Sequence, residues 1–147
     1  MIRPARFSDL HQIRFLAQTA FAPYAMRMGQ KPAPMSADYR ELVAIGKVQV
    51  YIIENAVRGF IVFHVDGPDV HIEAMAVAAK FRGRGVGRNL LNFADTAGIK
   101  AKCRRVVLYT NVLMFENIAY YKSKGFQEVD TRHQDGFERV YFERYLK

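Results

Sequence analysis

The chain contains a single cysteine, Cys103, and no tryptophan. One thiol cannot form an intramolecular disulfide, and it cannot supply the several thiolates of a typical structural zinc site. A sequence without a disulfide framework is typical of a reducing compartment, so we expect the protein in the cytoplasm. Glycine and proline are sparse, with 10 and 5 residues, which excludes a collagen-like chain and argues against disorder.

Long hydrophobic runs are also missing, so we expect no membrane-spanning segment and no membrane partner. The opening residues, Met1–Arg6, are basic but no apolar run follows them, and no signal peptide is expected. What remains is a globular composition, with 147 residues of which 50% are hydrophobic and 24% are charged. This length predicts a single domain over residues 1–147.

Positive charge is in excess and unevenly spread. The formal net charge is +8, and the segment from Lys80 to Arg105 holds eight basic residues against one acid, Asp95. Such a cluster indicates an anionic partner, such as a phosphate-bearing cofactor, nucleic acid or a membrane surface, or else a solvated helix face. Its basic residues are Lys80, Arg82, Arg84, Arg88, Lys100, Lys102, Arg104 and Arg105.

Helical spacing of apolar residues predicts four helices. The first would be capped by Ser8 or Asp9 and end near Met28. Glycine and proline predict a loop over 29–35, after which Ser36 would cap a shorter second helix. The other two helices are predicted over 85–101 and 115–124.

A hydrophobic period of two predicts strands in the rest of the chain, after a short strand near the amino terminus. The passage from Val70 to Thr110 reads strand–helix–strand, which is long enough for a right-handed crossover between parallel strands. The sequence therefore predicts a mixed α/β (α+β) sheet with one parallel pair. The predicted strands cover 48–53, 58–65, 70–77, 105–110, 127–133 and 137–145.

The most informative segment is Arg82-Gly83-Arg84-Gly85-Val86-Gly87, between a predicted strand and a predicted helix. Its glycines allow positive φ and close backbone approach, and the first amides of the helix favour an anion. The segment is no P-loop, because the string G-x-x-x-x-G-K-[ST] is absent, and it lacks the last glycine of a dinucleotide-binding turn. It therefore predicts a phosphate cradle of another kind.

Arg82, Gly85 and Gly87 fit the pattern R/Q-x-x-G-x-G/A, which resembles the pyrophosphate loop of the GNAT superfamily, the acyl-CoA-dependent N-acetyltransferases. Downstream, the segment Glu116–Phe126 resembles the family's N-x-x-x-Y-x-x-x-G-F helix. The element order is similar over essentially the whole chain. The resemblance implies a mostly antiparallel sheet of about seven strands, with one parallel pair splayed around an acetyl-CoA site and four flanking helices.

The resemblance also implies direct transfer, in which an amine attacks the thioester of acetyl-CoA in a ternary complex. Tyr121 matches the family tyrosine that protonates the leaving thiolate, with core packing as the alternative. Asn117 matches the asparagine that touches the pantetheine arm, with local backbone contacts as the alternative. The cofactor-binding residues implied are Met75, Ala76, Val77, Arg82, Gly83, Arg84, Gly85, Val86, Gly87, Arg88, Asn117 and Tyr121.

His71 and Glu73 are the candidates for the general base. They lie two apart on one predicted strand and so share a face, where they resemble the His-x-His pair of aralkylamine-type members, with glutamate in place of the second histidine. The alternative is an exposed or ion-paired couple. The other histidines, His11, His64 and His133, have no metal-ligand spacing, so no metal is expected and each is interpreted as a satisfied or exposed side chain.

The acceptor side is expected to come from the first two helices, their loop and the final hairpin. Phe21, Tyr24, Met26, Met28, Met35 and Tyr39 cluster in that part of the sequence. They predict either core or an apolar acceptor pocket. We expect a small-molecule primary amine as acceptor, while the sequence does not choose between it, a protein N-terminus and a lysine. The resemblance also allows a homodimer.

Rival interpretations give the basic segment other partners. An amine carried by a charged tRNA would use the positive charge, but the segment coincides with the phosphate loop, so a nucleic acid partner is not expected. A non-catalytic acyl-CoA sensor would keep the loop yet could dispense with Tyr121, which is present. A DNA-binding domain lacks support because no helix-turn-helix pattern is found.

Overall fold

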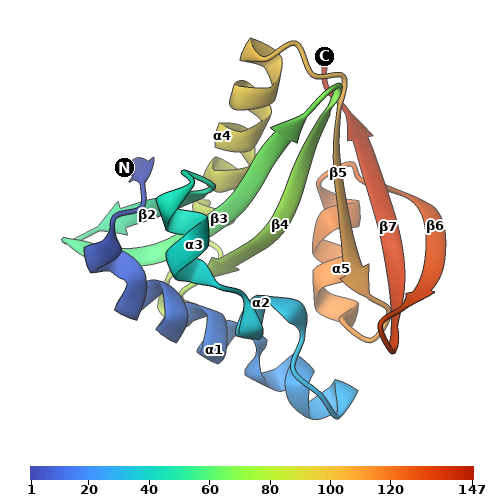
Figure 1. The fold of residues 1–147 in the computed structure, drawn as a ribbon, viewed down its shortest axis with the longest axis horizontal. Helices are drawn as coiled ribbons and strands as arrows, with labels where there is room; N and C mark the ends of the chain where they lie inside the picture. Colours follow the sequence, from blue (N-terminus) through green and yellow to red (C-terminus); the bar gives the residue numbers. More distant parts are fainter. The chain divides into compact units, whose positions relative to one another are not determined.

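The computed structural model describes all residues 1–147 and contains five α-helices and seven strands (Figure 1). The strands are β1 (Ile2–Pro4), β2 (Val48–Ile53), β3 (Ala56–Asp66), β4 (Asp69–Val77), β5 (Arg105–Asn111), β6 (Gln127–Gln134) and β7 (Phe137–Tyr145). The helices are α1 (Leu10–Met28), α2 (Ala33–Ser36), α3 (Tyr39–Ala44), α4 (Val86–Lys100) and α5 (Phe115–Ser123), with short 3-10 turns η1 (Phe7–Asp9) and η2 (Ala79–Phe81). Every predicted strand and helix is present.

The strands follow the order β1-β2-β3-β4-β5-β7-β6 in a seven-stranded sheet. The pair β4–β5 is parallel and aligns Asp69–His71 with Arg105–Val107. The pairs β1–β2, β2–β3, β5–β7 and β6–β7 are antiparallel. The mixed sheet with one parallel pair is thus confirmed.

The chain divides into two compact units that are each discontinuous in sequence. The first unit comprises Met1–His64 and Ile72–Ala94, and the second comprises Val65–His71 and Asp95–Lys147. Both β4 and α4 supply residues to each unit. The single domain over 1–147 therefore stays a prediction. None of the helices is long and apolar enough to cross a bilayer.

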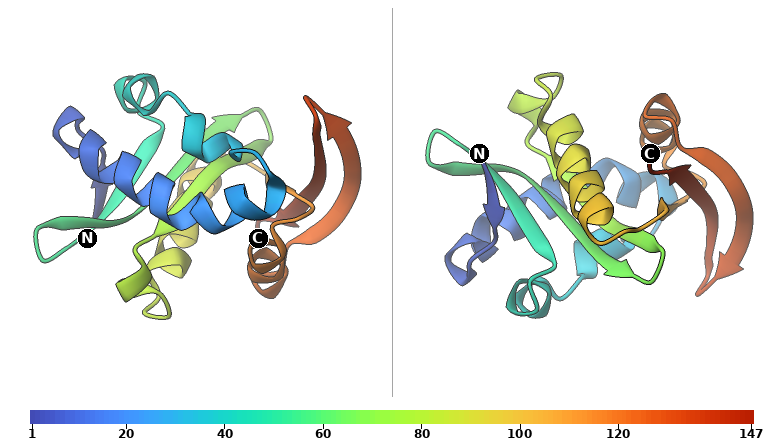
Figure 2. Two further views of the ribbon diagram at one scale, coloured as in Figure 1. Left: turned by 90° about the horizontal axis from the view of Figure 1, so that it is seen from below. Right: turned by 90° about the horizontal axis from the view of Figure 1, so that it is seen from above.

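In the first unit, α1 and α3 lie on one face of β2 and β3, and α4 starts on the other (Figure 2). On the α3 face the ring of Tyr39 meets Phe60 edge-on, with centroids 5.5 Å apart. The hydroxyl of Tyr39 donates to the carbonyl of Pro34, and burial raises the pKa of the phenol. On the α4 face, Gly59 has no side chain, which lets the helix come close to β3.

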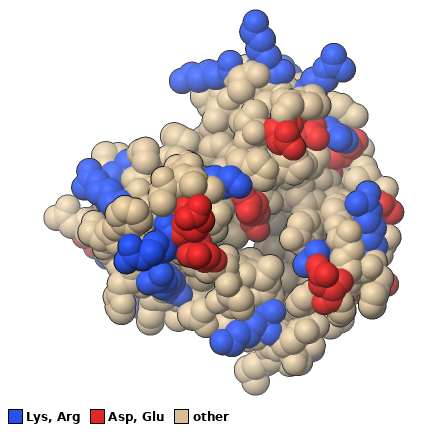
Figure 3. All heavy atoms as spheres, in the orientation of Figure 1, with Lys and Arg blue, Asp and Glu red and all other residues tan.

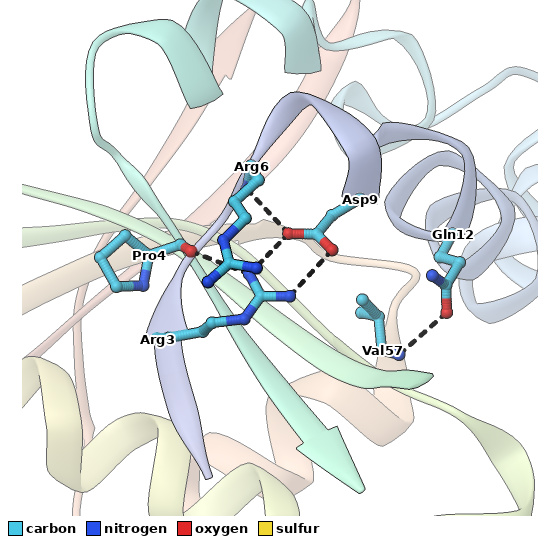
Figure 4. A network of polar contacts seen from close by, with 6 residues as sticks. All are labelled: Arg3, Pro4, Arg6, Asp9, Gln12 and Val57. Carbon is cyan, nitrogen blue, oxygen red and sulfur yellow. Dashed lines mark hydrogen bonds and ion pairs between the residues drawn. The ribbon is translucent and has the colours of Figure 1, made fainter. Parts of the chain in front are cut away.

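The start of α1 is held differently from the prediction. Asp9 is buried, but its carboxylate makes no cap bond to the helix. It accepts a hydrogen bond from the backbone N–H of Arg6 at 2.7 Å, and both guanidinium nitrogens of Arg3 donate to it (Figure 4). The pairing with Arg3 lowers the pKa of Asp9. Asp9 therefore stands at the N-cap position of α1, as predicted, but its side chain ties β1 to the turn before the helix and does not cap the helix itself.

Two further details between α1 and β2 differ from the prediction. The predicted loop over 29–35 contains part of a helical turn, α2, which begins at Ala33 and has Pro34 in its first turn, where proline is tolerated. With α2 the flanking helices number five rather than four. The next helix is capped by Asp38, whose carboxylate accepts from the N–H of Glu41 at 3.1 Å, and not by Ser36.

The second unit includes α5, the end of α4 and the strands β5, β7 and β6. Helix α5 lies beside β5 and β7 (Figure 1). Alternate residues of β5 and β7 are buried, namely Val106, Leu108, Thr110, Val140 and Phe142. Gly98 lets α4 approach β4, since a Cβ there would lie 2.5 Å from Cγ2 of Val70. Arg144 donates to Asp95 on α4, and burial raises the pKa of Asp95 although Arg144 opposes the rise.

Candidate functional site

The glycine loop, Arg82–Gly87, leads directly into α4. Gly83 and Gly85 have φ values of 76° and 84°, in the left-handed region that side chains rarely adopt. The carbonyl of Gly85 accepts the N–H of Asn89 at 2.9 Å, so the helical hydrogen bonding begins there. The amides of the first turn of α4 have no acceptor inside the helix and are oriented outward at its positive end. This is the geometry of an anion cradle.

Three contacts within the first unit fix the start of α4. A Cβ on Gly59 would lie 2.9 Å from Cγ1 of Val86 and 3.3 Å from Cδ1 of Leu90, so the helix packs directly on the β3 backbone. The side chain of Asn89 donates to the hydroxyl of Tyr51 on β2 at 3.2 Å. Val86 and Leu90 are buried by this packing. The glycine loop therefore leads into a helix that is packed directly against β3 and hydrogen-bonded to β2.

Positive charge surrounds the loop. The side chains of Arg82, Arg84 and Arg88 belong to exposed residues. The guanidinium of Arg88 lies over Gly85, where a Cβ would come within 3.0 Å of its Nη2. The guanidinium of Arg84 lies 5.1 Å from the ring centroid of Phe81. Glycine backbone, helix amides and arginines together fit a pyrophosphate, so the predicted loop residues are brought together.

The basic segment is not one cluster, however. Lys100, Lys102 and Arg104 are exposed and follow the far end of α4, where Figure 3 shows Lys and Arg side chains gathered at the top of the view. These cations belong to the second unit, whereas the glycine loop belongs to the first. Arg105 forms ion pairs with Asp69 and Glu143, with N–O distances of 2.7 and 2.6 Å. The loop therefore accounts for only part of the excess charge.

The end of β4 provides backbone amides. Within the first unit β4 has one neighbouring strand, β3. The N–H of Ala78, just after β4, donates to the carbonyl of Arg58 on β3 at 2.7 Å. Because hydrogen-bonding direction alternates along a strand, the N–H groups of Val77 and Met75 point to the opposite edge. Ala76 itself is buried. Either outward amide can donate a hydrogen bond to a carbonyl oxygen.

Glu73 on β4 belongs to a three-residue ionic group. Its Oε2 lies 3.0 Å from Nδ1 of His64 and 3.5 Å from Nζ of Lys47. All three side chains are partly exposed. His64 is thus a satisfied histidine, as predicted, while Lys47 was not predicted. His71, the second base candidate, pairs in register with Val107 in the second unit.

Tyr121 and Asn117 lie on α5. Tyr121 is buried between two aromatic rings, with its centroid 5.4 Å from Tyr120 and 5.5 Å from Phe126, both edge-on. Asn117 donates from its side-chain amide to the hydroxyl of Thr110 at 3.4 Å, which ties α5 to β5. The predicted alternative for Asn117, bonds to nearby backbone, is not what the structure shows.

Gly59 and Lys47 support the candidate residues but carry no local motif. Gly59 sits inside a strand pattern, where an isolated glycine can mark close approach of another backbone or helix. That signal was present in the sequence, although it did not reveal which helix approaches. Lys47 lies just before β2, and it contacts Glu73 on β4 because β2, β3 and β4 are neighbours in the sheet. The spacing of the two residues in the sequence does not reveal this contact.

The comparisons with known proteins agree on one fold. Residues 46–128 match the family model described as an acetyltransferase (GNAT) domain. Ard1 from Thermoplasma volcanium superposes with a TM-score of 0.79 at 22% identity, over 100% of this chain and 97% of that one. Naa50 from Arabidopsis thaliana, in complex with the bisubstrate analogue CoA-Ac-MVNAL, gives 0.73 at 22% identity, over 98% and 97%.

A third structure, the ribosomal-protein-S18-alanine N-acetyltransferase from Escherichia coli, gives a TM-score of 0.76 at 18% identity, over 99% of this chain and 93% of that one. At such identities the likeness establishes the fold. No curated protein has a sequence that matches this chain.

Proposed function

Because the chain belongs to the GNAT acetyltransferase family, we propose that it transfers an acetyl group from acetyl-CoA to a primary amine by direct attack in a ternary complex. The observation that carries the proposal is the glycine loop at the start of α4, with two glycines at positive φ and three exposed arginines. The residues proposed to hold the pyrophosphate are Arg82, Gly83, Arg84, Gly85, Val86, Gly87 and Arg88.

The reaction requires three contributions from the residues of this chain. When bound, acetyl-CoA supplies a thioester at which an N–C bond forms to the amine while the C–S bond breaks. The outward amide of Val77, next to Ala76 at the end of β4, holds the carbonyl oxygen as its negative charge develops. Tyr121 donates a proton to the leaving sulfur, and Asn117 supports the pantetheine arm.

The amine must lose a proton to become acetylated, and Glu73 is the proposed acceptor of that proton. Lys47 and His64 hold its Oε2, so the carboxylate is oriented. His71 is the second candidate for this role, two residues earlier on β4.

For the acceptor we propose a small-molecule primary amine, with a polypeptide α-amine as a second candidate. The second is favoured by the names of similar structures, which include Naa50 with a peptide-bearing analogue and the NatC complex bound to Gag peptide and CoA. Both acceptors present the same nucleophile, so the residues above serve either one.

The test is calorimetric titration with acetyl-CoA, followed by thiol release in the presence of two acceptor panels. Micromolar binding and release with small amines supports the first candidate, and release only with peptides of varied N-terminal residues supports the second. Absence of acetyl-CoA binding to the folded protein would refute the proposed function.

A further inference from the structure

The turn between α4 and β5 carries three exposed cations that the glycine loop does not account for. Lys100 is the last residue of α4, and Lys102 and Arg104 follow it before β5 begins. We call these three residues the basic turn, and all of them belong to the second unit. The next cation, Arg105, is ion-paired with two carboxylates, whereas the side chains of the basic turn have no acidic partner. Their charge is therefore presented to the solvent.

The end of α4 holds Lys102 in a backbone conformation that suits glycine. The N–H of Cys103 donates to the carbonyl of Gly98 at 2.8 Å, and that of Lys102 donates to the carbonyl of Ile99 at 3.0 Å. This is a Schellman motif, in which the residue at the position of Lys102 is usually glycine. Lys102 has a φ of 62°, which a Cβ makes costly. The helix end alone thus gives no reason for a lysine there.

The rest of the basic turn is tied to its neighbours within the second unit. Cys103 is buried, and its thiol donates to the carbonyl of Gly67 at 3.7 Å. The N–H of Arg104 donates to the carbonyl of Pro68 at 2.6 Å, and its own carbonyl accepts from the N–H of Leu146 at 2.7 Å. The cations on either side of the buried thiol therefore project from a fixed backbone.

The surroundings of the basic turn leave its charge largely uncompensated. Figure 3 shows Lys and Arg side chains gathered at the top of the view, with no Asp or Glu among them. The neighbouring β3–β4 turn carries Asp66, which is exposed, and Asp69, which is already ion-paired. The negative end of the helix dipole favours a cation in the last turn, where Lys100 stands. It does not account for Lys102 and Arg104, which come after the helix.

A polyanion with closely spaced charges fits this arrangement. Lys102 and Arg104 are two residues apart, so their Cα atoms are separated by about 7 Å at most. A strand of nucleic acid carries a phosphate about every 3.4 Å along its axis, and contacts to phosphates need positive charge alone. A membrane surface would also require apolar side chains to insert, and the large hydrophobic residue that α4 exposes is Ile99 alone.

We propose that the basic turn binds the phosphate backbone of a nucleic acid through its three cations. Such contacts position a strand without reading its bases. The site lies in the second unit and does not depend on acetyl transfer. It replaces the expectation that the phosphate loop accounts for the whole basic segment, from which the absence of a nucleic acid partner was predicted.

Binding is tested by fluorescence anisotropy of a labelled oligouridylate with the full chain, without acetyl-CoA and at several salt concentrations. Each phosphate contact to a single strand contributes about −0.7 to the slope of log K against log salt. The triple variant K100Q/K102Q/R104Q should therefore give a slope shallower by about 2, and binding at low salt weaker by tenfold or more. An unchanged slope in the triple variant overturns the proposal.

K102G separates the effect of charge from that of folding. Glycine relieves the positive φ, so the thermal unfolding midpoint should stay the same or rise, while the salt slope becomes shallower by about 0.7. The matched control is K31Q, which removes one exposed charge from the first unit and should bind as the wild type does. Equal losses of binding in K102G and K31Q would show that only net charge matters, and would overturn the proposal.

Two other polyanions are titrated in parallel, namely polyglutamate and vesicles of phosphatidylserine and phosphatidylcholine. Oligouridylate should bind more tightly than polyglutamate, and the vesicles should not bind. Equal or tighter binding of either competitor, lost in the triple variant, would assign the basic turn to an acidic polypeptide or to a membrane and overturn the proposal. Failure of the proposed function is a separate result, since it shows as missing acetyl-CoA binding and leaves the oligouridylate titration unaffected.

Discussion

The glycine loop carries arginines, and so does the face of β5, β7 and β6 that consists of Tyr109, Arg132, Phe137, Arg139 and Tyr141, here called the hairpin face. The two regions are built from different parts of the chain. The loop consists of consecutive residues, and its main donors are backbone amides at the start of α4. The hairpin face takes its donors and rings from side chains of three strands that lie far apart in the sequence. One is a backbone site and the other is a side-chain site.

This difference determines how each region can fail and how it can change. A backbone site keeps its amides whatever the surrounding side chains are, so only an added Cβ or a moved helix removes it. A side-chain site changes with each substitution while the fold persists.

The largest expected effect comes from Gly85→Val in the glycine loop. Valine at a φ of 84° is strained, and its Cβ would lie 3.0 Å from Nη2 of Arg88. Strain of about 1–3 kcal/mol and displaced amides should weaken acetyl-CoA binding by about 100-fold or more. Calorimetric titration measures this. Wild-type affinity in the variant would contradict the cradle.

Gly46→Val is the matched control for that strain. Gly46 has a φ of 76° and no atom within 4 Å of an added Cβ, so valine there meets the same backbone penalty outside the site. It should lower the unfolding midpoint and leave acetyl-CoA affinity unchanged. Equal losses of affinity in both variants would mean that Gly85 acts through stability alone.

Tyr121→Phe should affect turnover and not binding. Removing the phenol takes away the proposed acid, and such proton transfers contribute about 100-fold or more to rate. We expect kcat to fall by about that factor with acetyl-CoA affinity preserved. Tyr120→Phe, on the adjacent ring 5.4 Å away, is the control and should keep kcat. Unchanged turnover in the Tyr121 variant would remove it from the acid role.

The backbone site was predictable from the sequence because its determinants are local. Arg82, Gly85 and Gly87 are read within six residues, and the strand before and helix after them follow from hydrophobic period. For the same reason each strand and each of the four longer helices was predicted. The family resemblance then supplied roles for Tyr121 and Glu73 that spacing could not.

Features that depend on tertiary contacts were not predictable. Asp9 looked like a helix cap, yet Arg3 on β1 competes for its carboxylate. The ionic group around Glu73 joins residues from three places in the chain, with Lys47 26 residues away in sequence. The hairpin face depends on the register of β5, β7 and β6, which decides that Tyr109 meets Tyr141 and Arg139 meets Arg132.

A smaller effect, on stability and not on either ligand region, is expected for Asp9→Asn. The change breaks the ion pair with Arg3, at 2.7 Å, and should lower the free energy of unfolding by about 1–3 kcal/mol at neutral pH. Because Arg3 lowers the pKa of Asp9 in the folded state, its stabilisation is complete above the unfolded pKa, about 3.9, and is lost as pH falls through the lowered value.

Denaturant titrations of wild type and variant at several pH values measure this dependence. The difference between them should be constant above about pH 5 and shrink in more acidic solution. Asp66→Asn, at an exposed position, serves as the control and should behave like the wild type throughout. A difference that does not change with pH would show that the carboxylate charge contributes nothing.

The smallest expected effect separates the two groups of cations at the ends of α4. Arg84→Gln removes one exposed charge near the glycine loop and should weaken acetyl-CoA binding by at most about fivefold at low salt, since exposed ion pairs contribute about 0.2–1 kcal/mol. Raising the ionic strength should reduce that difference, because salt screens exposed charges. Lys100→Gln removes the same charge at the last residue of α4, outside the glycine loop, and should leave affinity unchanged at every salt concentration. Calorimetry at two salt concentrations distinguishes the two. If Lys100→Gln weakened binding as much as Arg84→Gln, the basic segment would act as one long-range field, and the backbone of the glycine loop would no longer be the main source of affinity.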